Sequence, residues 1–369
     1  MAETITRRVA IATGAAFGLT AGADATSLCT PVRLSDPETG LALEPGWRWQ
    51  AINDVPVRLQ EIYPATLDHE IIVAGGFSPD VASGEPMGVL DRAFRGVTWG
   101  DEQAPCGDGP RVEWHEIAPL PEPRHHPNLV GHQAHVYAIG GFRVSPSGAW
   151  TMIPNLTRYD RQNDVWSETT PLPEPFAETC AVSLGRFIHV ATGRQPAAAS
   201  NGQWVDHQDS GAHFAFDPDA QEWTRRAPNP NPRNSAAGVT LDGKFHVIGG
   251  RRVDDGNKAS HEAYDPVSDT WHSRAPLPQA QGGLAAAVSG GRIFAFGGEY
   301  FSNGGGVYPQ LWIYNARTDA WEAGPDMATP RHGLGGVSID GHIYAIGGAT
   351  GPSGQGTSNI VERLSWHFI

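Results

Sequence analysis

The sequence has few of the residues on which several common kinds of site are built. Its three cysteines, Cys29, Cys106 and Cys180, are too few and too scattered for a disulfide framework or a cysteine-rich metal site. One pair could form in an oxidising compartment, but the spacing does not select which. Lysine occurs only at Lys244 and Lys258, which leaves few candidates for Schiff-base chemistry.

Positive charge and signature motifs are scarce as well. The formal net charge is −14 at pH 7, which argues against a general nucleic-acid or anionic-membrane surface. Gly-x-Ser-x-Gly, phosphate-binding loops and zinc-protease motifs are absent, and no strand-to-helix pattern follows the glycine run at 304–306. The sequence therefore predicts no nucleic-acid partner and no nucleotide fingerprint.

Residues 1–25 have the order of an export signal. The arginines of Thr6-Arg7-Arg8 precede a mildly apolar run, Val9 to Ala21, and Ala23-Asp24-Ala25 has the form of a cleavage site. The run is too short to span a bilayer stably, and the arginine pair resembles a twin-arginine signal. We therefore expect a periplasmic or secreted protein with no membrane partner after cleavage, a linker at 26–46 and a folded region at 47–369.

What the chain does contain is an internal repeat. An apolar run ends in Gly-Gly, a polar loop follows, and an aromatic residue precedes a Trp by seven positions, as in Gly140-Gly141, Tyr159 and Trp166. The other Gly-Gly pairs are Gly75-Gly76, Gly249-Gly250, Gly297-Gly298 and Gly347-Gly348, with a degraded copy at Thr192-Gly193. The copies are roughly 48 to 65 residues apart, the period of four-stranded propeller blades, and six copies fit.

Each part of the repeat has a physical interpretation. Runs such as Val136 to Ile139 are short, apolar and bounded by turn residues, so they predict buried strands. Paired glycines end these strands where a side chain would collide or where positive φ is needed. The Tyr and Trp positions supply large apolar area between adjacent sheets, so we expect them in the core.

The recurring Gly-Gly, Tyr-Asp and Trp pattern resembles the kelch family, and the resemblance covers Trp47 to Ile369. It implies an all-β, six-bladed β-propeller. Because the last repeat ends before its Trp, the segment Trp47 to Pro56 is expected to complete the sixth blade as its fourth strand. The first blade is expected to have Val89 to Phe94 as its third strand and an inserted surface hairpin or loop at 95–113.

Function is expected at the channel mouth, on the face where the long, variable loops lie. Two sets of residues should meet there: those directly after Gly-Gly and those ten positions after each Trp. The first set contains Arg194, Arg251 and Glu299, and the second contains Arg124, Arg233 and Arg331. Arg binds carboxylates in a fork geometry, so this ring predicts a site for a small polar anion. Alternatively, these arginines bond only loop carbonyls.

Acid–base candidates lie in the same turns. We assign catalytic roles to Glu178, Glu299, His125 and His332, with His126 beside them, because proton transfer needs a positioned acid and base. Substrate-binding roles fall to Arg124, Arg194, Arg233, Arg251, Arg331 and Trp204.

A possible divalent metal site is formed by His207, Asp209 and His213 in the long loop of the third blade. The spacing matches no strong signature, and a solvated polar loop is the alternative. The iron motif of plant specifier proteins and the copper site of galactose oxidase, both kelch relatives, have no counterpart here. We predict no cofactor, with a divalent metal possible.

The resemblance leaves more than one function open. In size, blade number and export the chain is similar to bacterial periplasmic kelch mutarotases that act on sialic acid, which implies an isomerase acting on a sugar acid. The alternative is a non-catalytic propeller that binds a glycan or protein through Trp150, Trp204, Tyr300 and Tyr308. A metal-dependent lyase or oxidase is the second alternative. The sequence does not indicate the oligomeric state.

Overall fold

The computed structural model describes residues 45–81, 87–100, 109–146 and 148–367. The predicted export signal, nearly all of the predicted linker, Cys29 and Cys106 lie outside these ranges. Within them, Cys180 is a buried free thiol. No helix of the described part of the chain is long and apolar enough to cross a membrane.

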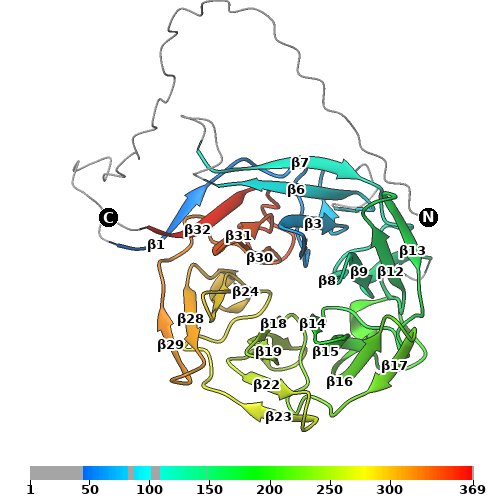
Figure 1. The fold of residues 1–369 in the computed structure, drawn as a ribbon. Helices are drawn as coiled ribbons and strands as arrows, with labels where there is room; N and C mark the ends of the chain where they lie inside the picture. The colour runs from blue at the N-terminus through cyan, green and yellow to red at the C-terminus, as the bar shows by residue number, and fades with distance from the viewer. Residues whose placement is uncertain (1–44, 82–86, 101–108, 147, 368–369) are drawn as a thin grey trace, which may run out of the picture. The chain divides into compact units, whose positions relative to one another are not determined.

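Six four-stranded antiparallel sheets, the blades, are arranged around a central axis (Figure 1). Blade one is β2 (Ala65–Leu67), β3 (Glu70–Ala74), β6 (Ala93–Trp99) and β7 (Arg111–Ile117). Blade two is β8 (Asn128–His132), β9 (His135–Ile139), β12 (Leu156–Asp160) and β13 (Val165–Glu168). Blade three is β14 (Cys180–Leu184), β15 (Phe187–Pro196), β16 (His207–Asp217) and β17 (Glu222–Arg225).

The remaining blades repeat this order. Blade four is β18 (Ala237–Leu241), β19 (Lys244–Ile248), β22 (His261–Asp265) and β23 (Thr270–Ser273). Blade five is β24 (Ala285–Ser289), β25 (Arg292–Phe296), β28 (Leu311–Asn315) and β29 (Ala320–Ala323). Blade six is β30 (Gly335–Ile339), β31 (His342–Ile346), β32 (Val361–His367) and β1 (Gly46–Ala51). The all-β, six-bladed propeller predicted from the repeat is therefore confirmed.

The predicted apolar runs form the second strand of every blade, and the glycines end those strands for the expected reasons. In blade two, Val136 of β9 lies opposite Tyr159 of β12. Gly140, which follows β9, has a φ of 55°, and a Cβ there would lie 2.2 Å from the carbonyl oxygen of Phe176. Only glycine fits such a turn without displacing the neighbouring backbone.

In blades two to five, the repeated Trp residue connects its blade to the one before it. The indole N–H of Trp166 donates to the carbonyl of Ala118 at 2.8 Å, and that of Trp271 donates to Ala227 at 2.8 Å. The aromatic partners Tyr159 and Tyr264 are buried. The expectation that these positions pack in the core is confirmed.

The N-terminal strand closes the ring. Along its whole length β1 pairs antiparallel with β32, with Trp49 opposite Leu364. The indole N–H of Trp49 also donates to the carbonyl of Pro325 at 3.1 Å, as Trp166 and Trp271 do to their own acceptors. The prediction that the segment from Trp47 supplies the fourth strand of blade six is confirmed, and pairing β1 with β32 removes two open sheet edges.

Blade one corrects one strand assignment. The predicted third strand, Val89 to Phe94, is two separate elements: β5 (Gly88–Val89) belongs to a small ribbon, and β6 begins at Ala93. The inserted residues lengthen the hairpin of β6 and β7, which stay paired as far as Trp99 opposite Arg111. The lengthened β7 is fixed to the segment after β1, because the Asn53 side chain bonds both the N–H and the carbonyl of Val112.

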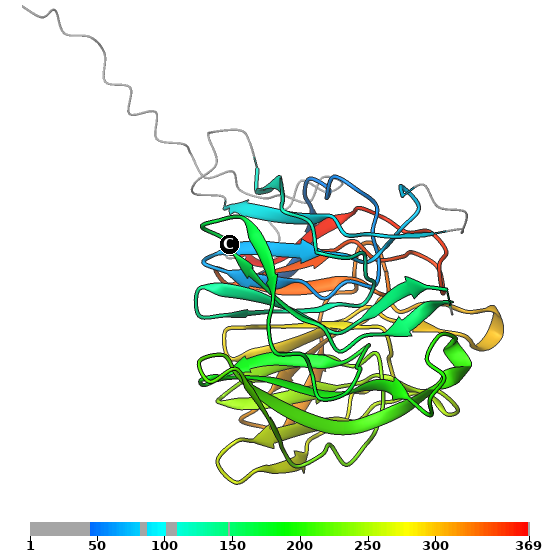
Figure 2. The same cartoon turned by 90° about the vertical axis from the view of Figure 1, so that its right-hand side faces the viewer.

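The connections between the second and third strands lie on one side of the ring, which we call the loop face. Most form two-stranded ribbons that project from that side in Figure 2. The ribbons are β4 (Phe77–Ser78) with β5, β10 (Phe142–Ser145) with β11 (Gly148–Met152), β20 (Arg251–Arg252) with β21 (Gly256–Asn257), and β26 (Glu299–Tyr300) with β27 (Gly306–Val307). In blade three, β15 and β16 themselves extend outward to the short helix η1 (Trp204–Asp206). A second short helix, η2 (Ser302–Gly304), lies at the tip of the β26–β27 ribbon.

Candidate functional site

Shortly ahead of the first strand of each blade, a single residue has a left-handed backbone. Together these six residues form what we call the left-handed ring. Its members, with φ between 48° and 70°, are Glu61, His126, Glu178, Ser235, Gly283 and Gly333. Only two are glycine, although glycine alone adopts this conformation without cost. Non-glycine residues in this region cost on the order of 1 kcal/mol or more and are concentrated at functional sites. The four polar members therefore mark the ring as a candidate site.

Backbone hydrogen bonds run around the left-handed ring from blade to blade. The N–H of His126 donates to the carbonyl of Glu61 at 3.1 Å, and that of Ser235 donates to Glu178 at 3.2 Å. Gly283 donates to Ser235 at 2.9 Å, Gly333 to Gly283 at 3.0 Å, and Glu61 to Gly333 at 2.6 Å. Because neighbouring blades hold these residues in register, their side chains converge on the axis from different parts of the chain.

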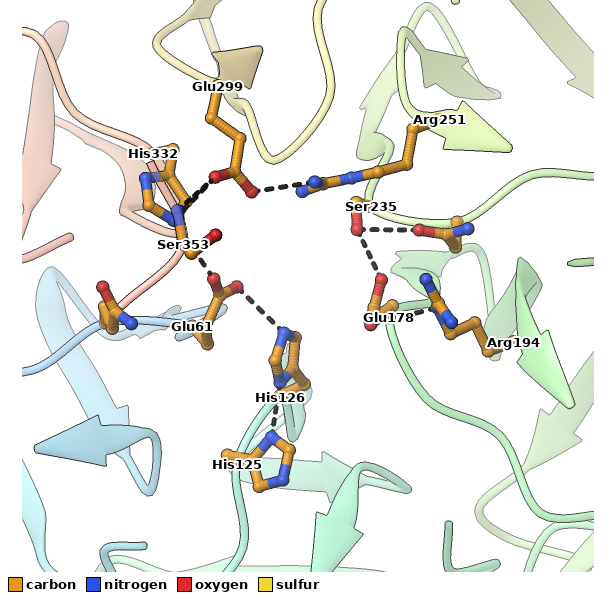
Figure 3. Close-up of polar contacts among 12 residues, drawn as sticks. Glu61, His125, His126, Glu178, Arg194, Ser235, Arg251, Glu299, His332 and Ser353 are labelled. Atoms are coloured by element: carbon orange, nitrogen blue, oxygen red, sulfur yellow. Dashed lines mark hydrogen bonds and ion pairs between the residues drawn. The ribbon is translucent and has the colours of Figure 1, made fainter. Parts of the chain in front are cut away.

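A second set of residues joins the ring through short antiparallel bridges. The residue before each ring position pairs with the residue after Gly-Gly of the same repeat, as in Ala177 with Arg194 and Asn234 with Arg251. Gly282 pairs with Glu299 in the same way. The two sets meet in one group, the mouth cluster, which consists of Glu61, His125, His126, Glu178, Arg194, Ser235, Arg251, Glu299 and His332 (Figure 3).

A chain of hydrogen bonds leads from a backbone carbonyl to Glu61. His125 Nε2 lies 2.8 Å from the carbonyl of Ala149 and must donate to it. Burial holds the pKa of His125 well below its ordinary value, so the ring is neutral and its Nδ1 accepts from His126 Nδ1 at 2.7 Å. His126 Nε2 lies 2.9 Å from Glu61 Oε2. The imidazole of His126 therefore connects His125 to the Glu61 carboxylate.

On the other side of Glu61, His332 lies between two carboxylates. Its Nε2 is 3.5 Å from Glu61 Oε1 and 3.4 Å from Glu299 Oε2. Burial lowers the pKa of His332, but the bond to Glu61 and the charges of Glu61 and Glu299 raise it more, so the net shift is upward. Burial likewise raises the pKa of Glu61, but His126 and His332 hold it well below its usual range. His332 can therefore carry a proton beside an ionised Glu61.

Glu299 is held by groups from blades four and six. Its Oε1 accepts from Arg251 Nη1 at 2.8 Å, and its Oε2 accepts from the backbone N–H of Ser353 at 2.7 Å. Burial lowers the pKa of the Arg251 guanidinium, but Glu299 and Glu178 outweigh it, and the net shift is upward. Arg251 therefore stays charged, and two donors fix the Glu299 side chain in place.

Glu178 faces this group from blade three. Its Oε2 accepts from the Ser235 hydroxyl at 2.5 Å, and its Oε1 is 3.1 Å from Arg194 Nε. Burial raises the pKa of Glu178, but Arg194 and His126 hold it below its ordinary value. Figure 3 shows Glu61, Glu178 and Glu299 pointing toward the same space from three blades. The site thus offers an ionised carboxylate on one side and, on the other, an imidazole that can carry a proton.

Arg194 has the most incomplete bonding in the mouth cluster. It is fully buried, yet its Nη1 and Nη2 have no hydrogen-bond acceptor among the described residues. Its guanidinium lies 3.2 Å from the ring centroid of Trp204, whose side chain is 40% exposed. A buried guanidinium without acceptors is costly, and an oxygen-rich ligand would remove that cost.

The structure places the other predicted arginines elsewhere. Arg233 donates to the carbonyls of Gly249, Asn231 and Val247 and to Glu262, inside its own blade. Arg331 donates to the carbonyls of Ile360 and Ala345 and to Glu362, and Arg124 donates to the carbonyl of Gly140. These three side chains bond mainly carbonyls, as the alternative interpretation expected. The side chain ten residues after the repeated Trp points into the blade, whereas the next two side chains point toward the axis. Of the predicted substrate-binding residues, Arg194, Arg251 and Trp204 lie at the mouth cluster or in contact with it.

The predicted metal ligands are held by other partners. His213 Nε2 is 2.9 Å from His189 Nδ1 in the interior of the blade. Asp209 accepts from Asn234 and from the N–H of Val253, while the ring of His207 stacks on Phe142 at 5.4 Å. Within the described ranges no three His, Cys, Asp or Glu residues are arranged to hold a metal ion.

Sequence reasoning missed Glu61, Ser235 and Tyr63. Glu61 and Ser235 follow Trp49 and Trp223 by twelve residues, the same offset that leads from Trp166 to Glu178, so the signal was present. Tyr63 lies beside the mouth cluster, where burial and the charges of Glu61 and Glu178 raise its pKa well above its ordinary value and keep the phenol protonated. Nothing in the repeat pattern marks Tyr63.

Comparison with known proteins agrees with this architecture. The family model described as the Kelch motif matches residues 232–278 and 282–328. Kelch-like protein 35 of Mus musculus is 31% identical over 140 residues, which cover 37% of this chain and 21% of that protein. Kelch-like protein terF of Aspergillus terreus is 26% identical over 203 residues, which cover 54% of this chain and 40% of that protein. The chain thus matches less than half the length of these relatives.

A solved structure described as the structure of YjhT has a similar fold. The TM-score is 0.68 at 15% sequence identity, and the match covers 86% of this chain and 99% of that chain. At this identity the similarity concerns the fold alone.

Proposed function

Because this chain is a kelch-repeat β-propeller, we propose that its mouth cluster is the active site of an isomerase that acts on a small polar anion such as a sugar acid. The observation that carries the proposal is the buried Arg194, whose Nη atoms lack acceptors next to paired acid and base groups. A ligand carboxylate would supply those acceptors. The resemblance of the sequence to bacterial kelch mutarotases also supports the proposal.

The proposed chemistry is the opening and closing of a sugar ring. Glu178 takes the proton from the anomeric hydroxyl while His332 donates a proton to the ring oxygen, so the bond between the anomeric carbon and the ring oxygen breaks and a carbonyl forms. Closure on the other face of the carbonyl reverses both transfers. Glu61 orients His332, and His126 holds the Glu61 carboxylate from the other side. Arg194 and Arg251 bind the carboxylate of the substrate.

The test is the rate at which the anomers of N-acetylneuraminic acid and glucuronic acid interconvert, measured by NMR exchange. We expect the protein to accelerate one of them, and Glu178→Gln to lower that acceleration by about 10²–10⁴-fold while binding persists. Gln keeps the size of the side chain and can still accept from Ser235. Glu174→Gln, on the exposed surface of the same blade, is the control. A rate equal to that in buffer, together with bound ligand, would favour the alternative function.

That alternative is a non-catalytic propeller that binds a glycan or a protein. The observation that favours it is the exposed Trp204 on the loop face, because aromatic rings stack on sugars and anchor protein partners. Export to the periplasm or the cell exterior belongs to both proposals. N-terminal sequencing of the mature protein would test it.

A further inference from the structure

Exposed apolar side chains are unevenly distributed over the molecule. Eight large hydrophobic residues of the described chain are exposed. Five of them, Val144, Trp204, Val205, Val253 and Phe301, belong to loop-face connections that begin directly after a Gly-Gly position or its degraded copy. The other three, Val165, Val267 and Trp366, lie outside those connections. We call Trp204, Val205 and Phe301 the apolar rim.

Two members of the apolar rim contact the arginines of the site. Trp204 lies over Arg194 at 3.2 Å, and the Phe301 ring lies 5.5 Å from Arg251. Phe301 is 57% exposed and Val205 is 85% exposed. Each buried guanidinium therefore has a partly exposed aromatic ring beside it, so polar and apolar binding surfaces are continuous.

The Trp204 loop is held in place by specific contacts. Asn201 bonds both the N–H and the carbonyl of Met152 in the neighbouring blade, at 3.1 and 3.0 Å. Asp206 accepts the N–H groups of Gly202 and Gln203, and the Trp204 ring packs edge-on against Trp150 at 5.2 Å. A fixed, exposed indole is unfavourable in water, so this surface is pre-formed for a ligand.

We propose that the ligand is amphiphilic: its anionic, polar end enters the mouth cluster, and an apolar or aromatic substituent lies on Trp204 and Phe301. This rests on the proposed function for the polar end. It adds a substrate class, since a free sugar acid has nothing to place on the apolar rim. A sugar acid that carries an aryl or acyl group contacts both surfaces at once.

The experiment measures the binding of three probes by calorimetry: glucuronic acid, 4-O-benzylglucuronic acid and hippurate, which has a carboxylate and a phenyl ring but no sugar. The benzyl derivative keeps the free anomeric hydroxyl and carries its ring next to the carboxylate. We expect it to bind about tenfold or more tighter than glucuronic acid. Trp204→Ala combined with Phe301→Ala should bring the two within about twofold. Phe301→Ser alone, which leaves the Trp204 packing intact, should remove part of the preference. Val267→Ser, an exposed position far along the chain from the apolar rim, is the control.

The outcomes separate the two proposals. Equal binding of glucuronic acid and its benzyl derivative, or a preference that survives both rim variants, overturns the amphiphilic ligand and leaves the sugar-acid function standing. Binding of hippurate and the benzyl derivative that depends on the rim, without binding of glucuronic acid, supports the apolar rim and overturns the sugar-acid function. If none of the three binds, both fall.

Discussion

Buried arginine, glutamate and histidine occur in two regions of this propeller, the blade interiors and the mouth cluster, and their surroundings differ. In blade four, Arg233 donates to three backbone carbonyls and to Glu262. At the mouth, Arg194 is just as buried, but its Nη atoms have no acceptor among the described residues. Histidine pairs show the same contrast: His246 and His261 contact each other in the interior, whereas His125 and His126 lead to a carboxylate.

This comparison teaches that burial of a charged group does not by itself identify a site. A pair such as Arg233 and Glu262 is part of the folded framework because its hydrogen bonds are made within the blade. At the mouth, incomplete bonding coincides with strained backbone at Glu61, His126, Glu178 and Ser235. Two independent costs in one place indicate a function.

The largest expected effect separates the two kinds of arginine. Arg233→Met leaves Glu262 buried beside unpaired carbonyls and should lower the free energy of unfolding by about 3–5 kcal/mol. Arg251→Met should cost less than half as much, because Glu299 keeps the Ser353 N–H and His332. Urea denaturation at pH 7 measures both. The double variant Arg233→Met with Glu262→Met should regain most of the loss, and equal losses for the two single variants would contradict the distinction.

The pH dependence of stability should differ between the regions. Burial lowers the pKa of His246 to about 4 and that of His261 to about 3, while the unfolded values are near 6.5. The unfolded chain therefore binds more protons as the pH falls below about 6.5, and stability drops, on the order of 3 kcal/mol for the pair near pH 5.5. The pKa of His332 is raised, so its contribution is present at acid pH and is lost as the pH rises through its folded pKa.

Denaturation at a series of pH values measures these contributions. His246→Gln with His261→Gln should flatten the acid side of the profile, and His332→Gln should flatten the neutral to alkaline side. If His332→Gln changed the acid side in the same way as the interior pair, the mouth would be electrostatically no different from the blades.

The smallest expected effect comes from substituting two glycines that both have positive φ. Gly333 and Gly341 have φ values of 56° and 84°. A Cβ at Gly333 would lie 2.7 Å from Glu61 Oε1, whereas a Cβ at Gly341 would meet nothing within 4 Å. Alanine at either position should cost about 1 kcal/mol of unfolding free energy. Only Gly333→Ala should displace Glu61 and change turnover and its pH profile. Equal turnover in both variants would show that the exact position of Glu61 does not matter.

The sequence was sufficient for the fold because each repeat carries its own strand and turn signals. The run Val136 to Ile139, the glycines after it and the Tyr159–Trp166 pair each predict local structure, and repetition predicts the ring. The site was harder to predict from the sequence, because two positions along the chain change the direction of a side chain from the blade interior to the axis. Arg124 and His126 differ in this way, and propensity does not distinguish them. Tyr63 reaches the site only through tertiary packing.

The left-handed ring affects how the binding site of such a propeller can evolve. All six of its positions are joined by five main-chain hydrogen bonds that do not depend on side-chain identity. The backbone therefore holds six fixed positions around the axis. Each blade can present a different side chain at its position while the spacing between positions stays constant. Glu, His, Ser and Gly already occupy these positions. A new ligand specificity can therefore arise by substitution at one blade at a time, without a change in the fold.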